Sequence, residues 1–564
     1  MSKKALTLLI SLIILIPIGI YFVAWDYYAI NIPKWDDHAL KAFIVEYLHA
    51  GTWQGKLKAL FKQHNEHRIA LDRFFALLDF SLFGALNYRH LMLIGNLLLV
   101  AVIPLWYILL KNNKKPLFAL VPVSFIWLTL AFWENMYWGM AAIQNFGVIT
   151  LMLWTIYLSL QPKPLPFILA IFLGALTIST SAIGILVLPI CAFLLFISAD
   201  RKRSVILVVA GIIGILAYFW TYKQPDTNPD SKASIFQLAK GYMAFLGSFA
   251  ESIPVKDHFG ACVILGIVLF LVAVSIISAT LFRISTKKYT VKFERITDLF
   301  CLGTLLFILG TALIVVYGRA GFGLEGLITS RFKIYSVLLL MVAYLYIVIP
   351  IRGSFLSPYI TAIIFLAITF NVFSYHYHLV DAFNLRKYMT TMQFNWTYMD
   401  KSLQAPADTS FAARIVKKTP VFYQKWLPLI AVADRQQYAG NSRALTELYA
   451  ATTFEKTQNS LLVKNTGFTS QRLQDSGIYI LLSSDKRFYV YPTYRIRNNN
   501  RKELFLKQYY FAPGFYADIP FSEIDKGEYK VAIIRQQGDE TGILFQQDKI
   551  SVDHVTKNKV KVNW

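Results

Sequence analysis

Residues 5–24 read ALTLLISLIILIPIGIYFVA, a run of twenty residues without a charged side chain. About 20 apolar residues are enough for a helix to cross the hydrocarbon core of a bilayer. A cleaved signal peptide would end in small residues. This run instead continues into the bulky sequence Trp25-Asp26-Tyr27-Tyr28. We therefore predict that it is a retained membrane-spanning helix.

The same pattern recurs through the first two thirds of the chain. Hydrophobic residues make up 56% of the sequence, and its mean hydropathy is +0.47. Soluble domains contain roughly 45–50% apolar residues, so this composition indicates a membrane protein. The two runs that meet at Ser181 are short, which leaves the helix count open. The sequence predicts eleven spanning helices, at 5–24, 90–110, 116–133, 144–160, 166–181, 183–198, 204–222, 259–282, 299–317, 334–350 and 358–373.

We attribute much of the net charge of +23 to Lys and Arg residues that set the membrane topology. In a soluble protein it would suggest binding to nucleic acid, but in a membrane protein Lys and Arg gather in the cytoplasmic loops. With the N-terminus inside, the inner segments carry fifteen such residues and the shorter outer loops seven. We predict no nucleic-acid partner, an N-terminus on the cytoplasmic side and a C-terminal domain outside.

The chain divides into three predicted parts. Residues 1–374 form a transmembrane module, and its outer loop 25–89 has apolar residues at the spacing of amphipathic helices. Residues 375–453 are predicted to be a helical connector. Residues 454–564 contain β-branched and aromatic runs such as SGIYILLSS, ELFLKQYYF and GEYKVAIIRQ, which predict strands. The predicted fold class is an α-helical polytopic membrane protein with a C-terminal soluble α+β or β-sandwich domain.

An acidic pair, Asp36-Asp37, lies eleven residues after the first helix, in the sequence WDDH. Adjacent carboxylates repel each other, so one of them can have a raised pKa and serve as a general base. Asp is also a favoured residue at the start of a helix, and the pair could cap a helix that begins near Ala39. The sequence leaves both roles open.

The outer loop also contains KQHNEHRI at residues 62–69. On a helix, His64, His67 and Arg68 would share one face, with Glu66 beside them. We expect this face to bind a phosphate through Arg68 or a substrate through His64, Glu66 and His67. A divalent metal held by Asp36, His64 and His67 stays open, although two histidines at this spacing match no closed zinc motif. A solvated helix end is the remaining alternative.

Two further polar groups are predicted at the same outer face. Glu134, Asn135, Trp138 and Gln144 combine an aromatic side chain with amides and a carboxylate, which suggests sugar binding. The second group, Arg319, Arg331 and Lys333, could bind a donor phosphate, because guanidinium groups match phosphate oxygens well. Alternatively, the aromatic residues form an interfacial belt and the cations contact lipid headgroups.

These features resemble the GT-C superfamily of integral-membrane glycosyltransferases. The layout is similar to that of the protein mannosyltransferases and the lipid A aminoarabinose transferase. The sequence also looks like a group of bacterial proteins described as glycosyltransferases. The resemblance covers residues 1 to about 374. It is carried by the acidic pair after the first helix and by the motifs WDDH, NEHR, ENMYWG and GRAGFG, with Ser330-Arg331 downstream.

The resemblance implies a location in the bacterial cytoplasmic membrane. It also implies a sugar donor linked to a polyprenyl phosphate or diphosphate and used on the periplasmic or extracellular face. The acceptor would be a cell-envelope glycan, lipid or protein. The first-loop acid of the family matches Asp36 or Asp37 as the base. The donor-phosphate role of Arg68, Arg319, Arg331 and Lys333 is inferred from their charge. The alternatives are a polysaccharide polymerase or ligase that uses lipid-linked oligosaccharides, and a flippase or transporter of lipid-linked glycans.

Overall fold

The chain folds into two compact units in the computed structural model. The helical unit comprises Met1–Tyr27, Ala42–Leu82 and His90–Tyr377. The sheet unit comprises Tyr28–Lys41, Phe83–Arg89 and His378–Trp564. The structure describes residues 2–224, 233–286, 292–399, 425–436, 438–439, 442–469, 473, 477–538 and 540–553. Part of the predicted connector 375–453, namely residues 400–424, lies outside the described residues.

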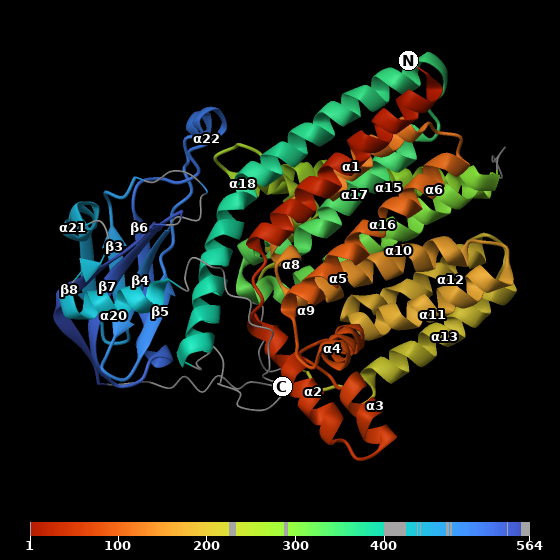
Figure 1. The fold of residues 1–564 in the computed structure, drawn as a ribbon. Helices are drawn as coiled ribbons and strands as arrows, with labels where there is room; N and C mark the ends of the chain where they lie inside the picture. The colour runs from red at the N-terminus through yellow and green to blue at the C-terminus, as the bar shows by residue number, and fades with distance from the viewer. Residues whose placement is uncertain are drawn as a thin grey trace. The chain divides into compact units, whose positions relative to one another are not determined.

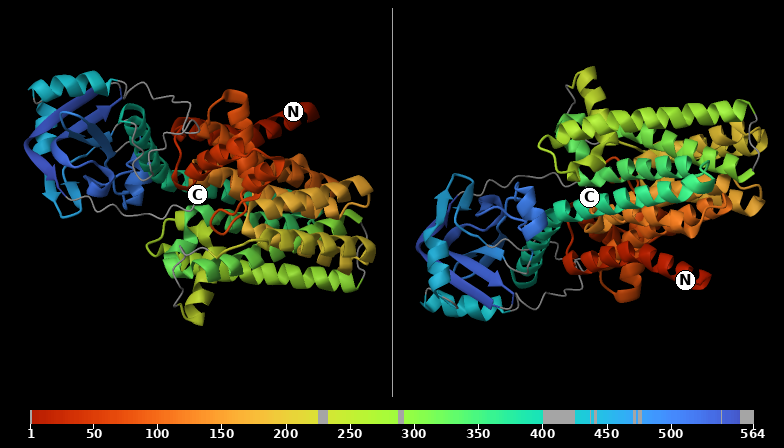
Figure 2. Two further views of the ribbon diagram at one scale, coloured as in Figure 1. Left: turned by 90° about the horizontal axis from the view of Figure 1, so that it is seen from below. Right: turned by 90° about the horizontal axis from the view of Figure 1, so that it is seen from above.

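Long apolar helices make up the helical unit, and they run side by side (Figure 1, Figure 2). Among the described residues, eight helices are long and apolar enough to cross a membrane, and three shorter apolar helices accompany them. Each of the predicted apolar runs is helical over most of its length. The chain is therefore a multi-pass membrane protein. The helices from the N-terminus to residue 399 are α1 (Lys3–Tyr28), α2 (His38–His49), α3 (Trp53–Phe61), α4 (Ala70–Phe83), α5 (Tyr88–Val100), α6 (Ile103–Asn112), α7 (Val121–Trp127), α8 (Trp133–Met136), α9 (Gly139–Ala141), α10 (Gly147–Ser159), α11 (Pro164–Thr180), α12 (Val187–Ile197), α13 (Arg201–Phe219), α14 (Ile235–Leu246), α15 (His258–Ser285), α16 (Lys292–Arg319), α17 (Lys333–Val348) and α18 (Leu356–Met399).

Helix α14 lies in a segment that was predicted only as an outer loop. It begins with a capping box in which Ser234 and Gln237 bond each other's main-chain N–H groups. Its main chain lies very close to α15. A Cβ atom added to Gly266 would lie only 1.7 Å from the main-chain oxygen of Met243. Small residues allow such close helix contacts in membranes. The close packing of α14 on α15 therefore requires glycine at position 266.

The sheet unit contains two antiparallel sheets, with strand orders β1-β8-β7-β4-β5 and β2-β3-β6. Buried side chains from β3 and β6 pack against those of β4 and β7 to form its main core. The opposite face of the larger sheet is covered by α20 and the end of α18, with Phe394 and Trp426 packed on it. The elements are α20 (Trp426–Gln436), β1 (Tyr438–Ala439), α21 (Ser442–Ala450), β2 (Thr452–Lys456), β3 (Ser460–Asn465), β4 (Gly477–Ser483), β5 (Phe488–Pro492), α22 (Arg501–Lys507), β6 (Phe515–Pro520), β7 (Gly527–Gln537) and β8 (Glu540–Val552).

One predicted strand in this unit is wrong. The run ELFLKQYYF at 503–511 begins inside helix α22, which spans Arg501–Lys507. Asn500 starts the helix, because its side chain accepts the N–H of Glu503. Gln508 ends it in the left-handed conformation. These local capping signals outweigh the aromatic pattern that had suggested a strand.

Candidate functional site

Residues 62–69 form a turn and not the predicted helix. Helix α3 ends at Phe61 and α4 begins at Ala70. His64 and His67 face each other through two main-chain hydrogen bonds of 2.8 Å each. Asn65 has a φ of +48°, in the left-handed region that Asn tolerates better than most residues. The prediction that His64, His67 and Arg68 share a helix face is therefore wrong, because Asn65 favours a turn.

Arg68 holds this turn to the rest of the helical unit. Its Nη1 donates to the Phe61 carbonyl at 2.8 Å. Its Nε and Nη2 donate to the carbonyls of Tyr218 and Trp220, at 3.1 and 2.5 Å. These carbonyls lie at the end of α13, and burial lowers the pKa of the Arg68 guanidinium. Because its donors are bound to the main chain, Arg68 has a structural role in the turn.

The carboxylate of Glu66 connects the turn to the end of α16. It forms a charged hydrogen bond with Arg319, whose side chain is 31% exposed. The Tyr218 hydroxyl donates to the Glu66 main-chain carbonyl. The guanidinium of Arg319 also lies 5.6 Å from the centre of the Phe322 ring. The predicted residues Glu66 and Arg319 are therefore in direct contact.

The histidines of the turn do not fit a two-histidine metal site. The Nδ1 atom of His67 accepts the main-chain N–H of Ala182 at 3.2 Å, which places the ring proton on Nε2. Nε2 lies 3.7 Å from the Glu66 carboxylate. The side chain of His64 is buried. Within the described ranges, no group of three or more His, Cys, Asp or Glu residues is arranged to hold a metal ion.

A second polar network connects α8 with the segment 319–333. The main-chain N–H of Glu134 donates to Ser330 Oγ at 3.1 Å, and Asn135 donates to the Arg331 carbonyl at 3.2 Å. Asn145 in turn donates to the Asn135 side chain at 2.8 Å. Glu134 and Asn135 are buried. The structure thus brings together the predicted sugar-binding residues and Arg331.

The guanidinium of Arg331 is held loosely within this network. Its Nε lies 3.4 Å from the Glu134 carboxylate, but this atom makes no hydrogen bond within the described part of the chain. Its Cζ lies 5.5 Å from the centre of the Trp138 ring, a distance typical of a cation–π contact. The side chain is 34% exposed. The Arg331 guanidinium is therefore partly exposed, although its Nε atom is buried.

Lys333 and Gln144 are more enclosed. The Lys333 side chain is 2% exposed and pairs with Glu251, which precedes α15. Little in the sequence points to this partner, because Glu251 is a lone acid that lies 82 residues before Lys333. Gln144 lies in a π-helical turn at Ala142–Phe146 and donates to the Thr180 carbonyl at 3.4 Å. Such turns are frequent at functional sites.

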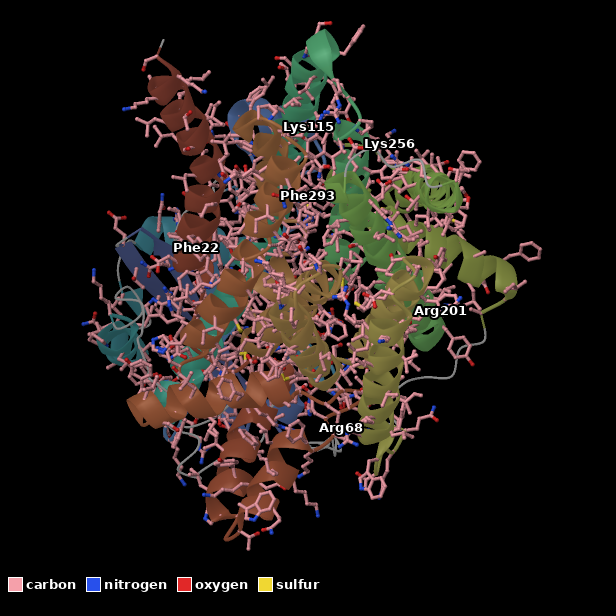
Figure 3. All side chains as sticks on the ribbon, turned by 90° about the vertical axis from the view of Figure 1, so that its right-hand side faces the viewer. Phe22, Arg68, Lys115, Arg201, Lys256 and Phe293 are labelled. Carbon is pink, nitrogen blue, oxygen red and sulfur yellow. The ribbon has the colours of Figure 1, made fainter. Side chains whose placement is uncertain are left out.

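Several of the predicted polar residues of the helical unit lie at helix ends. Arg319 ends α16, Lys333 begins α17, and Arg68 is bound to the end of α13. Figure 3 labels Arg68 low in the view, and Lys115 and Lys256 high in it. The pairs Glu66–Arg319, Glu134–Arg331 and Glu251–Lys333 each include a residue of the segment 319–333, from the end of α16 to the start of α17.

The acidic pair belongs to the sheet unit. Asp37 is buried, and its Oδ2 accepts the Lys34 N–H at 3.0 Å, just before α2 begins. Asp36 is partly exposed. Trp35 has a φ of +46°, which is strained for a bulky residue. Backbone strain of this kind clusters at functional sites. The Asp37 carboxylate thus bonds the main-chain N–H that precedes the short 3-10 turn Trp35–Asp37, and not an N–H of α2 as the predicted cap would. Asp36 is the more accessible acid.

No protein-family model, no curated protein and no solved structure matches this chain. The likeness to the GT-C glycosyltransferases accordingly rests on the sequence motifs alone.

Proposed function

We propose that this membrane protein is an inverting glycosyltransferase that uses a polyprenyl-phosphate sugar. Arg331 is the observation that supports this proposal best. Its guanidinium is partly exposed and lies against the Trp138 ring. A guanidinium of this kind suits a phosphate, which it can bind through two parallel hydrogen bonds. A position at the end of a spanning bundle suits a donor whose carrier is a lipid.

The reaction needs positive charge where the phosphate departs. The acceptor hydroxyl attacks the anomeric carbon and loses its proton to a carboxylate base. The bond from that carbon to the phosphate oxygen breaks, and the electron pair stays on the phosphate. Arg331 and Arg319 would stabilise this growing negative charge, as fixed cations do in other active sites. A single attack inverts the anomeric centre.

Sugar binding is assigned to the network around α8. Glu134 and Asn135 are buried polar residues beside Trp138, and buried polar groups with fixed hydrogen bonds give directional recognition of hydroxyl groups. Gln144 and the turn residues Glu66 and His67 complete the proposed substrate site. His64 and Arg68 would support the turn.

The base role is assigned to Asp36, as the sequence and its family resemblance suggest. We expect Asp36→Asn to lower transfer by about 10²–10⁴-fold, because a general base contributes an effect of that size. Asp37→Asn is the matched control, since an amide oxygen can still accept the Lys34 N–H. The measurement is sugar transfer in liposomes, with thermal unfolding as the test of folding. Full activity in both variants and in the double variant would refute the assignment.

A polymerase or ligase is the second candidate, because Arg319, Arg331 and Lys333 together could also bind a diphosphate. Purified protein should be supplied with labelled sugars on polyprenyl monophosphate and, separately, with oligosaccharides on the diphosphate. We expect transfer from the monophosphate donors only. Transfer from the diphosphate alone would favour the second candidate. Movement of the lipid across the bilayer without transfer would favour a flippase.

A further inference from the structure

The sheet unit contains a cavity of about 460 Å³ that the proposed reaction does not use. It lies beside α21, the loop after β3 and the end of β7. Binding sites for small ligands usually have volumes of about 300–1,000 Å³ and a few converging polar groups. The lining of the cavity includes Glu447, Asn465, Phe468, Arg535 and Gln537.

The aromatic wall of this cavity is rigid. The ring of Phe468 lies 5.0 Å from the guanidinium carbon of Arg495 and 5.9 Å from the Phe515 ring centre. Arg495 is 5% exposed, so the ring is packed against an immobile cation. The side-chain oxygen of Asn465 accepts the N–H groups of Gly467 and Phe468, at 2.9 and 2.8 Å. The loop that carries the ring is therefore fixed before any ligand binds.

The polar wall is balanced in charge. Among the lining residues, Glu447 is the acidic residue and Arg535 is the basic residue. Arg535 Nη2 donates to the Gln537 side-chain oxygen at 2.9 Å, which leaves the amide nitrogen of Gln537 as a donor. The carboxylate accepts hydrogen bonds, while the guanidinium and the amide donate them. This combination suits hydroxyl groups, which both donate and accept hydrogen bonds. A strongly charged ligand would find no excess of opposite charge among these lining residues.

We propose that this cavity binds a neutral glycan, with a sugar ring against Phe468 and its hydroxyls between Glu447 and Gln537. The apolar face of a sugar ring suits an aromatic platform, and burial of an aromatic face contributes strongly to binding. The identity of the glycan rests on the proposed function: for a glycosyltransferase, the bound glycan is the acceptor chain.

The proposal can be tested with full-length protein in lipid nanodiscs on an array of immobilised oligosaccharides. The probes are neutral gluco-, manno-, galacto- and N-acetylglucosamine oligomers, beside oligomers of uronic acids. We expect binding to at least one neutral series and to none of the uronates. Glu447→Gln and Phe468→Leu should each weaken it roughly tenfold, the loss expected for one good contact in a binding site.

Matched controls come from the same unit. Glu455→Gln changes an exposed acid on β2, and Phe454→Leu changes a partly buried ring that packs on the core outside the cavity lining. Both controls should bind like the wild type, and all variants should unfold at similar temperatures. No neutral glycan bound, preferential binding of uronates, or equal binding by cavity and control variants would overturn the proposal. Glycan binding without sugar transfer from any donor would refute the proposed function and leave the cavity assignment standing.

Discussion

Arg331 and Arg319 differ in how firmly their guanidinium groups are bound. Arg319 forms a charged hydrogen bond with Glu66, whereas Arg331 Nε lies 3.4 Å from Glu134 without a hydrogen bond to any described residue. Charge-assisted hydrogen bonds are roughly twice as strong as neutral ones. An incoming phosphate would therefore compete with a stronger partner at Arg319 than at Arg331.

This difference predicts unequal effects of substitution. Arg331→Gln should lower sugar transfer by about 10²–10³-fold, the usual effect of removing a group that stabilises charge in the transition state. Arg319→Gln should lower it less and should also loosen the turn at Glu66. Transfer rates at saturating donor, with thermal unfolding of both variants, measure this. An Arg319 variant with the larger catalytic loss would contradict the assignment.

Glu523 gives the sheet unit a dependence on pH. Burial raises the pKa of its carboxyl from 4.5 to about 7. The folded state therefore binds the proton more tightly than the unfolded state does, so stability falls as pH rises from about 4.5 to 7 and then levels off. Because the side chain is partly exposed, we discount the full shift and expect a loss of about 1–3 kcal/mol.

Glu523→Gln removes this ionisation. We expect the variant to be more stable than the wild type at pH 8 and nearly equal to it at pH 5. Amide hydrogen exchange in β6 and β7 reports the difference in the full-length protein. Glu455→Gln changes an exposed acid and retains Glu523, so this control should keep the pH dependence of the wild type. Unchanged amide hydrogen exchange in the variant at pH 8 would show that ionisation of Glu523 does not lower the stability of the sheet unit.

At the scale of elements, the turn at 62–69 has the clearest functional consequence. It directs Glu66 toward Arg319 and Arg68 toward the carbonyls at the end of α13. Two main-chain bonds between His64 and His67 close it, and Asn65 adopts the left-handed conformation that it requires. Asn and Gly adopt this conformation most readily, while a Cβ-branched or Ala residue is penalised.

Substitution of Asn65 tests the turn. Asn65→Gly should keep the stability of the wild type, whereas Asn65→Ala should lower it by roughly 1 kcal/mol, because Ala lacks the side chain that supports the left-handed conformation. Thermal unfolding in detergent and sugar transfer measure the two effects. Equal unfolding temperatures for the Gly and Ala variants would indicate that the turn is not strained at this position.

At the scale of the whole molecule, the orientation in the membrane decides which face carries the candidate site. The native cysteines Cys191, Cys262 and Cys301 are buried, so an engineered thiol can be labelled against a low background. Lys56, on α3, and Lys111, at the end of α6, are both exposed. The predicted topology places them on opposite sides of the membrane.

We expect Lys56→Cys to react with a membrane-impermeant maleimide in intact cells. Lys111→Cys should react only after the membrane is permeabilised, because the N-terminus and the end of α6 are predicted to be cytoplasmic. The opposite labelling pattern would invert the orientation and place the arginine pairs inside the cell. Labelling of both thiols in intact cells would contradict a spanning path between them.

The membrane-spanning architecture followed from the sequence alone, because the physical requirement is local. Each spanning helix needs only its own run of apolar residues, such as 5–24, whatever its neighbours are. The strands β4 and β7 were also visible in their β-branched runs. Helix α22 and the turn at 62–69 were missed, since each depends on a single residue: Asn500, which caps the helix, and Asn65, which adopts the left-handed conformation of the turn.

The candidate site required tertiary structure. Charges on Glu66, Glu134, Arg319 and Arg331 were recognisable in the sequence, but their pairing depends on segments about 200–250 residues apart meeting at one end of the bundle. No short stretch of sequence predicts such a long-range contact. The same holds for the Glu251–Lys333 pair and for the cavity beside Phe468. The sequence determined which elements form and which residues can carry charge, whereas only packing decided which of these charges are enclosed, like Lys333, and which, like Arg331, remain partly exposed.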